Sequence, residues 1–228
     1  MTTLGLTPEI AAMAEPRRAS SPREPLTGPT VLRGNSLHDE QIRGLVQQLF
    51  FRQSPGLVRH VGFAAVDAGT ETAQLCLDVA TVLSESGPND VGLIDARLQS
   101  EPLQTSLQLS TANRLDASWL LAPRLWLAPR RKWLDESSQR VWDPSLSRLR
   151  AVTLEFDFSI LCLDPFSWLT TRLSQTCNGV VMVLTANKTR RLVATRMYEQ
   201  LRRARIPVLG TVLTERRFPV PAGLYRNL

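Results

Sequence analysis

Apolar residues along this chain come in short continuous runs, separated by segments in which apolar and polar residues recur at helical spacing. Five runs have strand length, and continuous runs of this kind fit strands of a parallel sheet that are buried on both faces. They are Val61 to Val66, the run that ends in Asp95, Ser159 to Leu163, Val180 to Leu184, and Ile206 to Leu213. Amphipathic helices are predicted between them, over about Thr72 to Ser86, Asp143 to Leu154, and Thr189 to Ala204. This alternation predicts an α/β fold, a doubly wound, mainly parallel sheet flanked by helices.

The segment before the first strand divides into two parts. Residues 1–34 are rich in Pro, Arg, Ser and Thr and lack apolar periodicity, so we expect a disordered or loosely docked tail. From Asn35 or Ser36, either of which can cap a helix, LHDEQIRGLVQQLFF predicts a helix with acidic residues in its first turn. Its apolar positions predict a packing face made of Ile42, Leu45, Val46, Leu49 and Phe50. We expect residues 35–228 to form a single domain.

Residues 101–141 lack a clear pattern, apart from a short apolar run at Leu125 to Leu127 that is consistent with one more strand. Trp119, Trp126 and Trp133 are spaced seven apart, but prolines between them interrupt any helix, so a heptad is excluded. The tryptophans either pack over the sheet, which we favour, or mark an exposed partner surface.

Composition limits the class of protein. The 228 residues can bury one sizeable core, and no apolar run is long enough to span a bilayer, so we expect a soluble cytoplasmic protein. Cys76, Cys162 and Cys177 lack metal-binding spacing and are expected to be free, mainly buried thiols. His38 and His60 are too far apart to suggest a metal site, and we expect both at the surface.

The net charge of +6 is carried by arginine and is uneven. Ten basic residues lie between Lys188 and Arg226, against only Glu199 and Glu215. A solvated basic face is the favoured interpretation, and docking to anionic lipid headgroups or to an acidic partner is the alternative. No motif of a nucleic-acid reader is present, so we expect no nucleic-acid partner.

The segment from Val61 to Ala96 has the strand, turn, helix, strand order of a phosphate-binding P-loop unit. A working P-loop needs glycines for close backbone approach, a lysine for the phosphates, and a Ser or Thr hydroxyl for Mg²⁺. The turn from Asp67 to Thr70 holds one glycine, Gly69, and no lysine. The frame of the unit is present and its catalytic groups are missing.

The charge of this segment also opposes the binding of a nucleotide. Its charged residues are all acidic, namely Asp67, Glu71, Asp78, Glu85, Asp90 and Asp95. Losing the attraction of a lysine while gaining a nearby Glu71 weakens triphosphate binding by about 3 kcal/mol, more than a hundredfold. We therefore expect no bound cofactor, although the helix N-terminus still offers backbone N–H groups to a weakly bound anion.

Four blocks of the sequence together resemble the bacterial tyrosine kinases of capsule and exopolysaccharide assembly, a branch of the MinD/ParA-like P-loop proteins. EQIRGL resembles the helix that these kinases use to form rings, LIDARL resembles their second acidic motif, and EFDFSILCLDP resembles their Walker B strand. GVVMVLTANKTRRL and IPVLGTVLTERR together resemble the last two strands and the helix between them. The blocks are residues 40–45, 93–98, 155–165, and 179–192 with 206–217, and the resemblance covers about Asp39 to Arg217. It implies the P-loop NTPase fold and a place in exopolysaccharide synthesis or export.

The first departure from the family is in the nucleotide turn, which usually reads about S-x-x-P-G-E-G-K-[ST]-T. Gly69 falls on the first of its glycines, Glu71 on the second, Thr72 on the lysine and Ala73 on the Mg²⁺ hydroxyl. A shift of one residue makes Thr72 the hydroxyl, but no shift supplies a lysine. With Thr70, these residues are the remnant that the resemblance implies of a nucleotide site.

The acidic motifs are partly retained. Asp95 stands at the second motif, where Arg97 replaces the next acid, and Asp164 stands at the Walker B position. These three residues complete the vestigial nucleotide site. The two aspartates either form a residual Mg²⁺ or water-activating pair or, as we favour, hydrogen-bond adjacent turns.

The ring-forming helix is also partly retained. Glu40 and Arg43 match the family motif, and the resemblance assigns them to an interface between subunits, but Val46 replaces its second arginine. The tyrosine-rich tail of the family is absent, since the chain has only Tyr198 and Tyr225.

The sequence therefore favours a catalytically degenerate, kinase-like protein, an assembly or regulatory partner of a membrane-embedded polysaccharide co-polymerase. Such a protein would be held at the inner face of the membrane by the cytoplasmic segment of that partner, and homo-oligomers are compatible with it. The first alternative is an atypical tyrosine kinase or ATPase that binds Mg²⁺-ATP through a relocated cation such as Arg97. The second is a MinD-like positioning factor that docks on anionic lipid through the helix predicted at 189–204.

Overall fold

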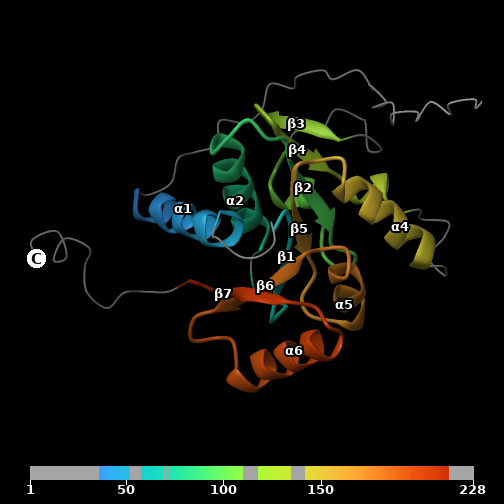
Figure 1. Cartoon of the computed structure of the whole chain (residues 1–228). Coiled ribbons are helices and arrows are strands. Elements are labelled where there is room, and N and C mark those ends of the chain that lie inside the picture. The colour runs from blue at the N-terminus through green and yellow to red at the C-terminus, as the bar shows by residue number, and fades with distance from the viewer. Residues whose placement is uncertain are drawn as a thin grey trace, which may run out of the picture.

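The computed structural model describes residues 36–51, 58–68, 70, 72–109, 118–134 and 142–215. Within these residues a single sheet has the strand order β3-β4-β2-β5-β1-β6-β7 (Figure 1). The strands are β1 His60–Ala65, β2 Val91–Ala96, β3 Trp119–Ala122, β4 Leu125–Ala128, β5 Phe158–Leu163, β6 Gly179–Thr185 and β7 Val208–Thr214. Every pairing is parallel except that of β3 with β4. The predicted fold class, a doubly wound and mainly parallel sheet, is confirmed.

Helices cover both faces of this sheet (Figure 1). α1 Ser36–Phe50 and α2 Ala73–Glu85 pack on one face, and α4 Trp142–Thr153, α5 Trp168–Ser174 and α6 Arg191–Arg203 on the other. Two shorter helical pieces complete the described structure, α3 Leu103–Ser106 and the 3₁₀ turn Arg130–Lys132. No helix among the described residues combines the length and the apolarity needed to cross a membrane.

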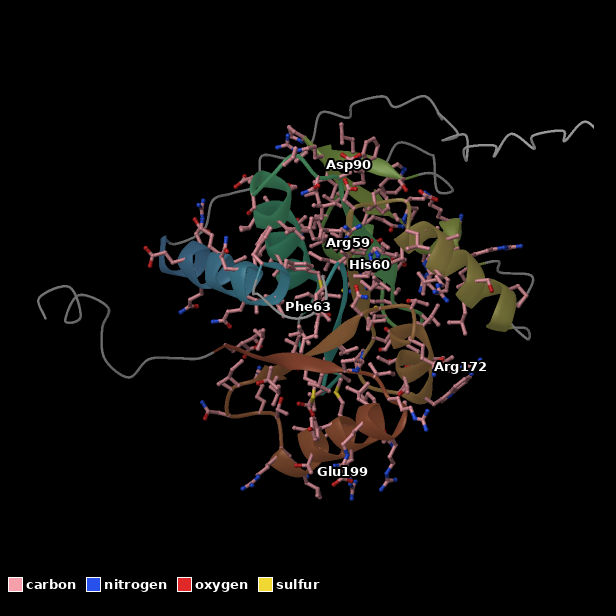
Figure 2. All side chains as sticks on the ribbon, viewed as in Figure 1. Arg59, His60, Phe63, Asp90, Arg172 and Glu199 are labelled. Atoms are coloured by element: carbon pink, nitrogen blue, oxygen red, sulfur yellow. The ribbon has the colours of Figure 1, made fainter. Side chains whose placement is uncertain are left out.

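Alternate residues of the inner strands face two separate cores, as the twofold repeat of a strand requires. Phe63 packs under α1 and α2, whereas its neighbour Ala64 packs under the helices of the opposite face. Figure 2 shows Phe63 among the side chains of the interior. Gly92 is required where β2 meets the ring of Phe156, because an added Cβ would lie 2.2 Å from its Cδ2 atom.

The predicted packing face of α1 is confirmed. Ile42, Val46 and Phe50 are buried, and Leu45 and Leu49 pack against the same core. The ring of Phe50 meets that of Phe158 on β5 edge to face, with centroids 5.7 Å apart. Val46, at the position of the missing arginine, is only 1% exposed, so this position belongs to the core.

Some local predictions need correction. Asp143 and Pro144 lie inside the first turn of α4, which begins at Trp142, rather than at its cap. His60 is half-buried rather than exposed, because it opens β1 beside the turn before β6, where the Oδ1 atom of Asn178 accepts its N–H at 2.8 Å. Burial lowers the pKa of the His60 imidazole, helped by the charge of Arg59.

The unpatterned region contains more structure than the sequence predicted. Besides the expected strand near Leu125, β3 forms a hairpin with β4 through a turn at Pro123 and Arg124, where Arg124 has a φ of 62°. Trp119 and Trp133 are buried in opposite cores, and Trp126 is half-buried. The preferred interpretation, packing over the sheet, is right for these residues. The predicted tail, residues 1–34, lies outside the described residues.

Candidate functional site

The strand order brings the candidate motifs to one edge of the sheet. β5 lies between β1 and β2 and runs parallel to both, so the carboxyl ends of all three strands point the same way. The turn after β1, the segment after β2 and the segment after β5 therefore meet at this edge. Open α/β sheets bind ligands at such an edge, where the chain order reverses.

The threonines of the turn between β1 and α2 face inward. Thr70 is buried, and its hydroxyl lies 2.9 Å from that of Thr185 at the end of β6. Thr72 is also buried, and its Oγ1 atom lies 3.6 Å from the Sγ atom of Cys162 on β5. Ala73, the first residue of α2, is 2% exposed and has no hydroxyl. These side chains hold the turn against the sheet.

A second contact holds the start of the same turn. The Thr189 hydroxyl donates to the carboxylate of Asp67 and accepts the backbone N–H of Thr185 at 2.9 Å. The segment before α6 therefore fixes the nucleotide turn from the side of β6. Gly69 and Glu71, which the family pattern places on its two glycines, lie outside the described residues.

The carboxylate of Asp164 binds the turn that follows β2. Its oxygens accept the backbone N–H groups of Leu98, of Gln99 at 2.8 Å and of Ser100 at 3.0 Å, together with the Ser100 hydroxyl at 2.6 Å. Asp164 is 4% exposed. Four donors from one turn therefore converge on a single buried carboxylate.

Asp95 is equally engaged, although it lies within β2 itself. One of its carboxylate oxygens accepts the N–H of Leu103 at 2.8 Å, and the other accepts the N–H of Arg97 at 3.2 Å. Its backbone carbonyl accepts the indole N–H of Trp133 at 2.9 Å. The side chain is fully buried, and this desolvation raises the pKa of Asp95 even though the hydrogen bonds and the charge of Arg97 oppose it.

Arg97, the candidate for a relocated cation, is held inside the protein. Its guanidinium is 3.6 Å from the Asp95 carboxylate and donates from Nη2 to the Ser106 hydroxyl at 3.1 Å. Its Nε atom is buried and has no hydrogen-bond acceptor. Arg130 donates to the Arg97 carbonyl at 2.8 Å. Arg97 is 6% exposed, so its charge is directed at Asp95 rather than at solvent.

Cys76, in the first turn of α2, and Cys162, on β5, belong to the same core, and both are fully buried and free. Burial raises the pKa of the Cys76 thiol well above its ordinary value. Cys177 is half-buried and free, and desolvation raises its pKa to about 12. The prediction of free, mainly buried thiols is confirmed, but the place of Cys162 beneath the nucleotide turn had no signal in the sequence.

The helix α1 also carries the two residues that the resemblance assigns to an interface. Glu40 and Arg43 are both exposed. Their contact with another subunit stays a prediction. Among the described residues, no three His, Cys, Asp or Glu side chains gather as a group that could hold a metal ion.

The sheet order and the turn at the end of β1 define the class of fold, that of the ParA-like P-loop ATPases. The ParA family ATPase from Chlorobium tepidum TLS has this fold, with a TM-score of 0.56 and 15% identity over 68% of this chain and 73% of that chain. At such identity the likeness is one of fold. No protein-family model matches the chain, and no curated protein sequence does either.

Within this class, the structures that resemble the chain include kinase domains of bacterial tyrosine kinases. That of Escherichia coli ETK gives a TM-score of 0.61 and 14% identity, and covers 90% of this chain and 89% of its own. The BceF tyrosine kinase domain gives 0.58 and 18%, over 80% of this chain and 79% of its own. The family resemblance seen in the sequence is confirmed at the level of fold.

Proposed function

We propose that this protein is a catalytically inactive, kinase-like assembly or regulatory partner in bacterial exopolysaccharide synthesis or export. It would bind the cytoplasmic segment of a membrane-embedded co-polymerase and be held at the inner face of the membrane by that partner. Its kinase-like fold and the exposed Glu40 and Arg43 of α1 supply the binding surface in this proposal. No phosphoryl transfer is assigned to it.

One observation carries the proposal, the contact between Thr72 and Cys162. In P-loop enzymes a Ser or Thr hydroxyl and a Walker B carboxylate hold the same Mg²⁺ ion, so the two side chains must face each other. Here the residue of β5 that the hydroxyl of Thr72 faces is Cys162, a thiol. The carboxylate of Asp164, which the resemblance places at the Walker B position, lies two residues further along and binds the turn after β2. A cysteine sulfur is a poor ligand for Mg²⁺, which prefers oxygen ligands.

The described residues at this edge therefore do not fit a Mg²⁺-nucleotide. Asp95 and Asp164 already accept hydrogen bonds from the backbone, and Thr72 is in contact with the sheet. In the alternative, an atypical tyrosine kinase or ATPase, Arg97 would have to leave Asp95 and Ser106 before its guanidinium could reach a phosphate. Breaking a buried ion pair of this kind costs about 3–5 kcal/mol, because it leaves an uncompensated charge.

Isothermal titration of the purified protein with Mg²⁺-ATP and Mg²⁺-ADP at low salt tests the proposal. We expect no binding heat from the wild type. Two variants restore the missing groups in the two possible registers of the turn, Thr72→Lys with Ala73→Thr, and Glu71→Lys with Cys162→Asp. Binding by either variant would support a preserved frame that has lost its ligands.

Two results would overturn the proposal. Micromolar binding of Mg²⁺-ATP by the wild type is the first, and an Arg97→Ala variant would then test the relocated cation. Tyrosine phosphorylation of a co-polymerase segment by the purified wild type is the second, and an Asp95→Asn variant controls for a contaminating kinase.

A further inference from the structure

The outward side of α6 is a strongly basic surface. The helix packs on the sheet through Met197 and Leu201, which are fully buried. Its other side is exposed, and Figure 1 shows α6 as the outermost described element at its end of the molecule. We call the exposed arginines of this helix and its two flanking residues the α6 basic face, which consists of Arg190, Arg191, Arg196, Arg202, Arg203 and Arg205.

The charge of the α6 basic face is uncompensated within the described structure. None of the ion pairs among the described residues involves these six arginines. Glu199 is the one acidic residue between Arg190 and Arg205, which leaves a net charge of +5. Figure 2 shows Glu199 on the outer side of α6. An anionic surface would neutralise this charge.

The α6 basic face also exposes two apolar side chains. Leu192 is 62% exposed and Tyr198 is 48% exposed. Leu192 precedes the buried Met197 by five residues, and Tyr198 follows it by one. At 100° per residue, both side chains therefore project from the outward half of the helix. Anionic lipid attracts arginines close to its surface, and the exposed Leu and Tyr side chains add apolar contact with the headgroup region. An arginine guanidinium binds lipid phosphates bidentately.

We propose that the α6 basic face docks directly onto an anionic lipid bilayer. The occupant is a bilayer rather than an acidic peptide because the face is the outer side of a single outermost helix (Figure 1). A flat, extended anionic surface contacts arginines along the whole helix at once, whereas a peptide is bound most tightly in a groove. This inference goes beyond the proposed function, because it requires no protein partner.

Each arginine near an anionic membrane contributes about 1 kcal/mol, or about fivefold in partitioning. Replacing Arg196 and Arg203 by glutamate changes the charge by four, so binding should fall by about a hundredfold or more. Glu199→Gln removes the opposing charge and should tighten binding by about fivefold.

The test is co-sedimentation of the full chain with phosphatidylcholine vesicles, with and without phosphatidylglycerol, at physiological salt. The Arg196→Glu, Arg203→Glu variant is compared with a matched control, Arg59→Glu with Arg150→Glu, which makes the same charge change at exposed arginines on other elements. The control is essential because arginines also occur outside the described residues. Thermal denaturation verifies that both variants are folded.

We expect the wild type and the control to bind only the anionic vesicles, and the α6 variant to lose this binding. Equal loss in the α6 variant and the control would overturn the proposal, since it would show a general charge effect. Binding of the wild type to polyglutamate but not to anionic vesicles would also overturn it, and would identify an acidic polypeptide as the occupant. Because no co-polymerase or nucleotide is present, these outcomes are independent of the proposed function.

Discussion

The carboxylate of Asp164 distinguishes a structural role from a catalytic one, because the two roles predict opposite effects on stability. In a working site, a Walker B aspartate is held for Mg²⁺, and removing its charge relieves repulsion when the ion is absent. Here the carboxylate accepts the N–H groups of Leu98, Gln99 and Ser100, and the Ser100 hydroxyl. Asp164→Ala removes every one of these acceptors at once.

The expected cost follows from these contacts. A hydrogen bond to a charged group contributes about 1.5–3 kcal/mol, but the bonds of one carboxylate are not additive. Gln99 is exposed and Leu98 and Ser100 are half-buried, so water can replace part of what is lost. We therefore expect Asp164→Ala to lower the free energy of unfolding by about 3–5 kcal/mol. Asp164→Asn keeps one acceptor oxygen and should lose about half as much.

Urea denaturation followed by tryptophan fluorescence measures this difference. Asp90→Ala is the matched control, because Asp90 stands at the opposite end of β2 and is half-exposed, and it should cost less than about 1 kcal/mol. If Asp164→Ala were as stable as the wild type, or more stable, the structural role assigned to this carboxylate would be refuted. The alternative, that Asp164 binds a metal ion, would then be favoured.

Gly92→Ala should lower the unfolding free energy by about 1–3 kcal/mol in urea denaturation, because the added Cβ would lie 2.2 Å from the ring of Phe156. At Gly210 an added Cβ meets nothing within 4 Å, so Gly210→Ala should cost less. Burial raises the pKa of Asp95, so the folded state binds its proton more tightly than the unfolded state does. Compared with Asp95→Asn, the wild type should therefore lose stability as the pH rises from about 3.8 to the raised pKa, and no further above it, in a series of urea denaturations. Cys177, with a pKa of about 12, should react with Ellman's reagent at pH near 8 only after denaturation, so that rapid reaction of this thiol in the native protein would contradict the raised pKa.

Much of the fold could be predicted because most of its strands and helices follow from local patterns of apolar and polar residues. Continuous apolar runs identified the strands that are buried on both faces, and helical spacing identified the buried face of α1. β3 was missed because its hairpin turn lacks the usual signal. Arg124 takes a φ of 62°, where Gly or Asn is the ordinary choice, and the strand is only four residues long.

The sequence predicted where the candidate site lies, but not which contacts its side chains make. Strand order places Asp95 and Asp164 at the ends of neighbouring strands, as the sequence indicated. Their partners could not be predicted, because Asp164 binds a turn about 65 residues earlier in the chain and Asp95 binds Trp133 through its carbonyl. Such contacts are set by packing between distant segments and leave no local pattern. The facing pair of Thr72 and Cys162, 90 residues apart, is of the same kind.

The thiol at Cys162 and the missing lysine are consistent with each other on electrostatic grounds. Cys162 is fully buried, and it lies beside Asp95 in the parallel pairing of β2 with β5. A carboxylate at this position would be a second buried negative charge next to Asp95, whose own pKa is already raised by burial. In a P-loop enzyme the lysine and the Mg²⁺ ion of the nucleotide turn would compensate it. Once the lysine is absent, a neutral side chain at Cys162 is the more stable choice, and α2 can pack directly on β5 through Thr72 and Cys76. Restoring a carboxylate at Cys162 alone should therefore destabilise the protein, which is why the titration pairs Cys162→Asp with Glu71→Lys.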